Sequence, residues 1–186
     1  MGLGRVGGGA AWALVAWVVG ASEGPKAPLP QEALPEYALK GRFLLQFPEF
    51  VSWPPDAGLA DANAPFVLVI LGTSPFDKAF EASTAGRKVK GHPLKVVYAT
   101  ELSALDGSHM VFICPSEKGR LKEILTHIGS KPILTVGDTE GFGKRGVMIN
   151  LAIQENLPRF EINLSSARWN NLGFSAQLLG LARKVW

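Results

Sequence analysis

Four short runs of mostly apolar residues constrain the fold of this chain more than any other feature. They span residues 65–72, 94–99, 110–114 and 133–137. Runs of this length that are almost continuously apolar are typical of strands buried on both faces. Helical patterns separate several of the runs, and right-handed crossovers between such strands produce a largely parallel sheet.

Two further strands are predicted near the C-terminus, and they should pair differently. Residues 147–153 and 159–164 flank the short segment 154–158, which has the length of a hairpin loop. The predicted fold class is therefore α/β: a mixed, mostly parallel sheet of five or six strands flanked by helices, with a β-hairpin near the C-terminus.

The first helical pattern begins at Glu36, and Pro48 interrupts it. Proline removes a backbone donor and crowds the preceding turn, so a kink or a restart is expected there. An aromatic stripe steps along this segment at intervals of three or four residues: Phe43, Phe47, Phe50 and Trp53. Such stripes usually face a sheet. If Phe47 and Trp53 were exposed, they would instead form a partner-binding or dimer surface.

Three more helices are predicted further along the chain. A short one is expected over residues 76–83, and a second is expected to begin at a Ser116 cap and to run to about Ile128. A final helix should follow the hairpin, capped by Ser165 or Ser166.

The first residues predict export. Arg5 precedes the uncharged, apolar run 10–19, a pattern typical of a secretory signal peptide. We expect a signal peptide over residues 1–21, a flexible lead-in over 22–35 and a single domain over 36–186. An uncleaved anchor is the alternative, although a spanning helix needs about 20 apolar residues. No cysteine lies near the expected cleavage site after residue 21, so attachment of a lipid to a new N-terminal cysteine is excluded.

Composition and charge exclude several classes of function. The formal net charge is +3 over 186 residues, which is too weak to indicate nucleic-acid binding. Cys114 is the single cysteine, so no internal disulfide can form, and burial as a small hydrophobe is expected for it. The three histidines are isolated in sequence, so no zinc site is expected. The protein is predicted not to be an enzyme.

The glycine-rich segment 137–146 is predicted to be a contact loop. A phosphate-binding loop would lead into a helix, whereas a strand follows this segment. Phe142, Lys144 and Arg145 would project from the loop tip, and such residues are enriched at interface hot spots.

Asp138 ends the fourth predicted strand, where open α/β sheets often bind ligands. Its simplest interpretation is an acceptor for the amides of the following turn. The alternative is a ligand crevice at the strand ends, formed by Gly72, Ser74 and Asp138.

Several motifs occur in order, nearly without gaps, along the predicted domain. They occupy residues 37–44, 50–54, 70–76, 90–93, 109–113, 133–138, 141–142, 146–150, 159–164, 167–168 and 177–182. In these motifs the chain resembles the YfiR-like family of periplasmic proteins. The family often has cysteine where this sequence has Ser108, so redox control through an internal disulfide is not expected here. Pro48 is also unusual for the family.

The resemblance implies a periplasmic regulator. Proteins of this kind bind the outer portion of a membrane-anchored diguanylate cyclase and hold it inactive, which lowers cyclic di-GMP and biofilm formation. We therefore expect a periplasmic regulatory binding protein whose partner is such a cyclase or a similar sensor. A homodimer is a further expectation, and no cofactor, metal or nucleic acid is expected. The alternatives are a periplasmic small-molecule-binding domain and a hydrolase centred on Cys114.

Overall fold

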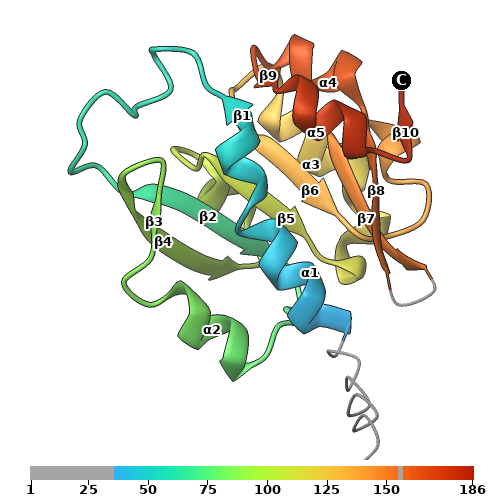
Figure 1. Cartoon of the computed structure of the whole chain (residues 1–186), viewed down its shortest axis with the longest axis horizontal. Helices are drawn as coiled ribbons and strands as arrows, with labels where there is room; N and C mark the ends of the chain where they lie inside the picture. Colours follow the sequence, from blue (N-terminus) through green and yellow to red (C-terminus); the bar gives the residue numbers. More distant parts are fainter. Residues whose placement is uncertain (1–35, 155–156) are drawn as a thin grey trace, which may run out of the picture. The chain divides into compact units, whose positions relative to one another are not determined.

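A mixed eight-stranded sheet forms the centre of the computed structural model, which describes residues 36–154 and 157–186 (Figure 1). The predicted signal peptide and lead-in lie outside the described residues. The sheet order is β10-β8-β7-β6-β5-β2-β4-β3. The strands are β2 (Phe66–Leu71), β3 (Lys88–Val89), β4 (His92–Ala99), β5 (Met110–Ile113), β6 (Leu134–Gly137), β7 (Ile149–Gln154), β8 (Leu157–Ile162) and β10 (Lys184–Val185). A separate pair joins β1 (Val51–Ser52) to β9 (Gly173–Phe174).

The four apolar runs form β2, β4, β5 and β6, which pair in parallel as predicted. β7 and β8 form the predicted antiparallel hairpin. The prediction of five or six mostly parallel strands is wrong in size and in character, because the sheet has eight strands in the described residues and is antiparallel near both ends. β3 and β10 have two residues each, too few for a periodic pattern to reveal them.

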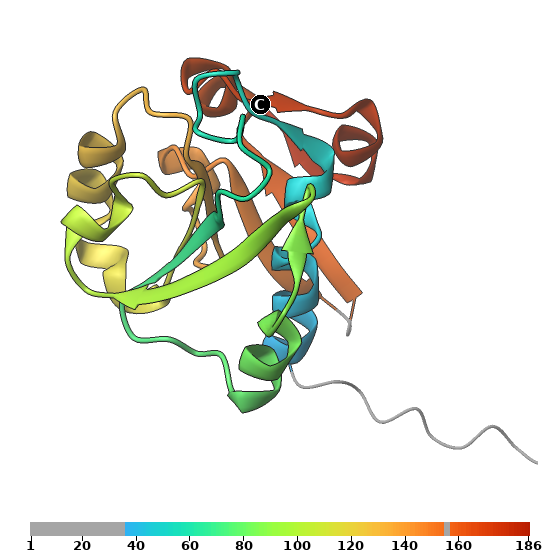
Figure 2. The same cartoon turned by 90° about the vertical axis from the view of Figure 1, so that its left-hand side faces the viewer.

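Five α-helices in the described residues cover the two faces of the sheet (Figure 2). They are α1 (Glu36–Leu44), α2 (Lys78–Thr84), α3 (Leu121–Ile128), α4 (Leu164–Trp169) and α5 (Ala176–Leu181). α3 packs on one face, and α1, α2, α4 and α5 contribute to the core on the other. Among residues 36–154 and 157–186, no helix has the length and apolar character needed to cross a bilayer.

The alternation of side chains along β2 explains why its sequence is apolar throughout. Leu68 and Ile70 belong to the core cluster beneath α1, whereas Val69 and Leu71 belong to the cluster beneath α3. All four side chains are buried. Because successive residues of a strand point to opposite faces, a strand between two helical layers needs apolar residues at every position.

The first helical segment breaks and restarts near Pro48, as predicted. α1 ends at Leu44, and a 3₁₀ turn over Phe47–Phe50 follows, with proline in its first turn. Proline is favoured there because the first backbone N–H groups of a helical turn have no partner in the turn. Phe47 is buried, and its ring packs 5.4 Å from that of Phe160 (centroid to centroid). The core interpretation of the aromatic stripe is therefore confirmed for Phe47.

Two predicted helix starts are wrong. Ser116 lies in a 3₁₀ turn before α3, and its Oγ accepts the Thr73 N–H at 2.9 Å. The final helix is divided into α4 and α5 by β9. Ser165 and Ser166 lie inside α4, whereas Asn163 caps this helix by accepting the Ser166 N–H at 2.9 Å. Ser175 caps α5.

Asn163 joins α4 to the glycine-rich loop, because its Nδ2 also donates to the Gly143 carbonyl at 2.8 Å. We expect Asn163→Ala to lower the free energy of unfolding by about 1–3 kcal/mol, through loss of the cap and of this buried hydrogen bond. Urea denaturation measures the effect. Ser165→Ala is the matched control, with an expected change within about 0.5 kcal/mol, and equal effects would contradict the assigned cap.

Candidate functional site

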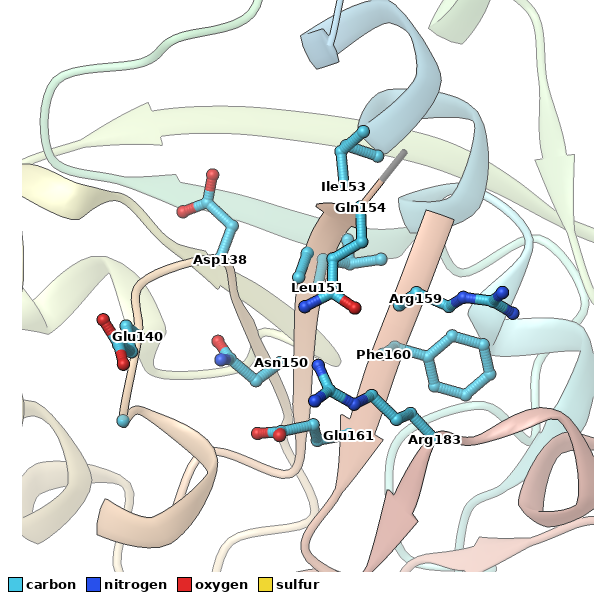
Figure 3. Close-up of a pocket in the computed structure, with 12 residues that line it drawn as sticks. Asp138, Glu140, Asn150, Leu151, Ile153, Gln154, Arg159, Phe160, Glu161 and Arg183 are labelled. Atoms are coloured by element: carbon cyan, nitrogen blue, oxygen red, sulfur yellow. The ribbon is translucent and has the colours of Figure 1, made fainter. Parts of the chain in front are cut away.

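A polar hollow beside the β7–β8 hairpin is the candidate functional site (Figure 3). Its volume is about 450 Å³, within the range of small-molecule sites. Loop residues after β6 form one wall, and side chains of β7 and β8 form another. We call it the hairpin hollow, and its polar lining comprises Asp138, Glu140, Asn150, Arg159, Glu161 and Arg183.

The hairpin register brings the polar lining onto one face. Asn150 lies opposite Glu161, and Ala152 lies opposite Arg159. Residues directly opposite in an antiparallel pair point to the same face. Leu151, between Asn150 and Ala152, is in the hydrophobic core. The hairpin therefore buries one face in the core and carries the polar residues of the lining on the other.

Two acceptor atoms in the lining are buried and have no hydrogen-bond partner among the described residues. Asn150 donates from Nδ2 to the Thr139 carbonyl at 3.0 Å, but its Oδ1 is unpaired. Asp138 accepts from Lys40 through Oδ2, whereas its Oδ1 is unpaired. A buried acceptor without a donor costs about 1–3 kcal/mol, so such atoms favour binding of a ligand with donors.

Asp138 and Lys40 form a buried ion pair between β6 and α1. Lys40 Nζ lies 2.7 Å from Asp138 Oδ2, and the two side chains are 4% and 1% exposed. The ammonium also pairs with Glu36 and lies 4.5 Å from the centroid of the Tyr37 ring. The prediction that Asp138 serves mainly as an acceptor for turn amides is therefore wrong, because its paired oxygen accepts from a lysine distant in sequence.

Burial raises the pKa of Tyr37 well above its usual value, and the neighbouring Asp138 carboxylate adds to the shift. Both causes favour the neutral phenol. Tyr37 therefore stays protonated beside the ion pair across the physiological range.

Cys114, which follows β5, is fully buried. Burial raises the pKa of its thiol to about 12, and the charges of Asp138 and Glu117 add to the shift. The thiolate is the nucleophilic form of cysteine, so a protonated, inaccessible thiol does not support the hydrolase alternative.

Gly72 and Ser74 do not line the hollow that Asp138 lines. A Cβ atom on Gly72 would clash with Ser116 Oγ, so the backbone there is already in close contact with the 3₁₀ turn that contains Ser116. Ser74 Oγ accepts the Phe76 N–H at 3.2 Å. The crevice predicted from Gly72, Ser74 and Asp138 is not assembled by this hollow, which joins Asp138 to the hairpin instead.

The prediction that Phe142 projects from the glycine-rich loop is wrong. Phe142 is 0% exposed, and a Cβ atom on Gly137 would lie 2.7 Å from its ring. The missing side chain of Gly137 therefore allows the ring to lie against β6. Lys144 and Arg145 are exposed, as predicted. Trp53 is half-buried, with its ring 5.3 Å from that of Phe66 (centroid to centroid).

Sequence reasoning missed most of the hollow. Asn150, Ala152 and Gln154 alternate with large apolar residues at 149, 151 and 153, and this pattern could have indicated a strand with one face outside the core. The partnership of Lys40 with Asp138, 98 residues away, has no local signal.

We expect Lys40→Met to lower the free energy of unfolding by about 3 kcal/mol, because it leaves the Asp138 carboxylate buried without its cation. Adding Asp138→Asn should recover about 1–2 kcal/mol, since the uncompensated charge is then removed. Urea denaturation of the two single variants and the double variant measures the coupling. If the losses of unfolding free energy in the two single variants simply added in the double variant, the direct interaction between the two side chains would be contradicted.

We expect Cys114 to resist a thiol–disulfide reagent near pH 8 in the native protein and to react fully in denaturant. A thiol pKa raised to about 12 keeps the neutral form dominant at every pH below that value. The absorbance of the chromophore that the reagent releases measures the number of modified thiols. Rapid modification of the folded protein would show that Cys114 is accessible.

Comparison with known proteins identifies the family. A search of curated proteins returned no match to this chain. Residues 37–183 match the family described as YfiR/HmsC-like, which covers the whole span from α1 to the C-terminal segment, including the hairpin hollow and the buried ion pair. The chain belongs to the YfiR/HmsC-like family.

Proposed function

We propose that this protein is a periplasmic regulator that restrains a membrane-anchored diguanylate cyclase by binding the cyclase's periplasmic region. The family match over residues 37–183 is the observation that carries this proposal. The family is regulatory rather than catalytic, and regulation of this kind requires a rigid surface that fits a partner.

The glycine-rich loop offers a fixed cationic part of such a surface. Asn163 Nδ2 and Trp186 Nε1 both donate to the Gly143 carbonyl, at 2.8 and 3.3 Å, and the Phe142 ring is buried. Lys144 and Arg145 therefore extend from a loop that is held at its base. A surface that is ordered before binding loses less conformational entropy on association.

An exposed aromatic residue lies near this loop. Trp169, the last residue of α4, is 71% exposed. It lines a shallow hollow of about 390 Å³ together with Leu125, Met148 and Gly146. Leu125 also lines an adjacent hollow together with Arg145. The aromatic and cationic groups therefore belong to one surface, the α4–loop surface, which comprises Trp169, Leu125, Lys144 and Arg145.

The chemistry of the α4–loop surface defines the partner segment that it would fit. An apolar group beside Trp169 and acidic groups opposite Lys144 and Arg145 would complement it. Tryptophan and arginine are enriched among the residues that dominate binding energy, and complementary charges accelerate association. We propose that the periplasmic region of the cyclase presents an acidic segment with an apolar anchor to this surface.

We expect the protein without residues 1–21 to bind the purified periplasmic region of the cyclase in titration calorimetry. Trp169→Ala should weaken binding by roughly thirtyfold, equivalent to about 2 kcal/mol for loss of an aromatic anchor. The double variant Lys144→Glu with Arg145→Glu should weaken it at least tenfold, more strongly at low salt.

Lys95→Glu, an exposed charge reversal on β4, is the control and should bind normally. Absence of any association of the unaltered protein would refute the proposed partner. Normal binding by the Trp169 and loop variants would refute the surface and leave the partner standing.

A further inference from the structure

We propose that the hairpin hollow binds a small zwitterion that carries both a primary ammonium and a carboxylate, the chemistry shared by free amino acids and short peptides. This inference is independent of the proposed cyclase partner. It depends on two unpaired acceptors, on two arginines and on the balance of charge around the hollow.

The unpaired acceptors define the site for the ammonium. Asp138 Oδ1 and Asn150 Oδ1 are buried, both residues line the hollow, and neither atom has a donor among residues 36–154 and 157–186. An ammonium carries three donors and no acceptor. Two of its protons can satisfy these atoms, and the Glu161 carboxylate, opposite Asn150 across the hairpin, is available for the third.

The arginines define the site for the carboxylate. Neither Arg159 nor Arg183 takes part in an ion pair within the described part of the chain. Figure 3 shows the Arg183 guanidinium directed toward Asn150 and Glu161, whereas the Arg159 side chain extends away from these two residues. Guanidinium groups bind carboxylates through two parallel hydrogen bonds, so Arg183 is the inner anchor and Arg159 lies at the rim.

The charge balance favours a zwitterion over a simple anion or cation. Lys40 neutralises Asp138, which leaves two carboxylates, Glu140 and Glu161, and two guanidinium groups, Arg159 and Arg183, in the lining. A simple anion would leave the buried acceptors without donors, and a simple cation would leave the arginines unpaired. A molecule with both groups satisfies both parts of the lining.

The probes are L-alanine for a free amino acid and L-alanyl-L-alanine for a short peptide, titrated into the protein without residues 1–21 and followed by calorimetry. We expect at least one of them to bind. The probe that binds more tightly shows whether the site takes free amino acids or short peptides. The N-acetylated and C-amidated forms of that probe each lack one charge and should bind at least tenfold more weakly. No binding of either zwitterion at millimolar concentration, or equal binding of a blocked form, would overturn the proposal.

Arg183→Gln tests the carboxylate anchor, and it should weaken binding of the preferred probe at least tenfold. Arg42→Gln makes the same change of charge at an exposed position on α1, outside the hollow, and should have no effect. Circular dichroism confirms that both variants are folded. Equal affinities of the two variants would overturn the assignment, and the loop variant Lys144→Glu with Arg145→Glu should keep probe binding, which separates this site from the α4–loop surface.

Discussion

Burial of the central strands on both faces is the constraint on which the rest of this structure depends. β2 and β5 contribute side chains to two core clusters, one beneath α3 and one beneath α1, α2, α4 and α5. Each large apolar side chain that is fully buried contributes about 1.5–3 kcal/mol. A sheet buried in this way has little room for chemistry at its centre, so polar groups collect at strand ends, in loops and on the hairpin.

The buried ion pair connects that core to the hairpin hollow. Lys40 is in α1 and Asp138 directly follows β6, so their contact fixes the position of a helix and of a strand end together. Two charges removed from water are stabilised only by close geometry and additional hydrogen bonds. Glu36 and the Tyr37 ring provide further contacts to the ammonium. One oxygen of Asp138 is thereby committed to the fold, and the other is left for the hollow.

The α4–loop surface and the hairpin hollow share the glycine-rich segment that joins β6 to β7. Asp138 and Glu140, near its start, line the hollow, whereas Lys144 and Arg145, near its end, belong to the α4–loop surface. The buried Phe142 lies between these two parts of the segment and anchors it to the core. A change in the position of the segment would therefore act on both surfaces.

The sequence by itself determined the parallel core strands, the C-terminal hairpin, the restart at Pro48 and the family. These features are local: apolar runs, turn residues and motifs are read from consecutive positions. Tertiary structure decided the short edge strands, the hydrogen bond from Asn163 to Gly143, the burial of Phe142 and the pairing of Lys40 with Asp138. The physical reason is that each of these depends on groups distant in the chain, such as the bare backbone of Gly137 beneath Phe142. Contacts of that kind exist only after the sheet has brought the segments together.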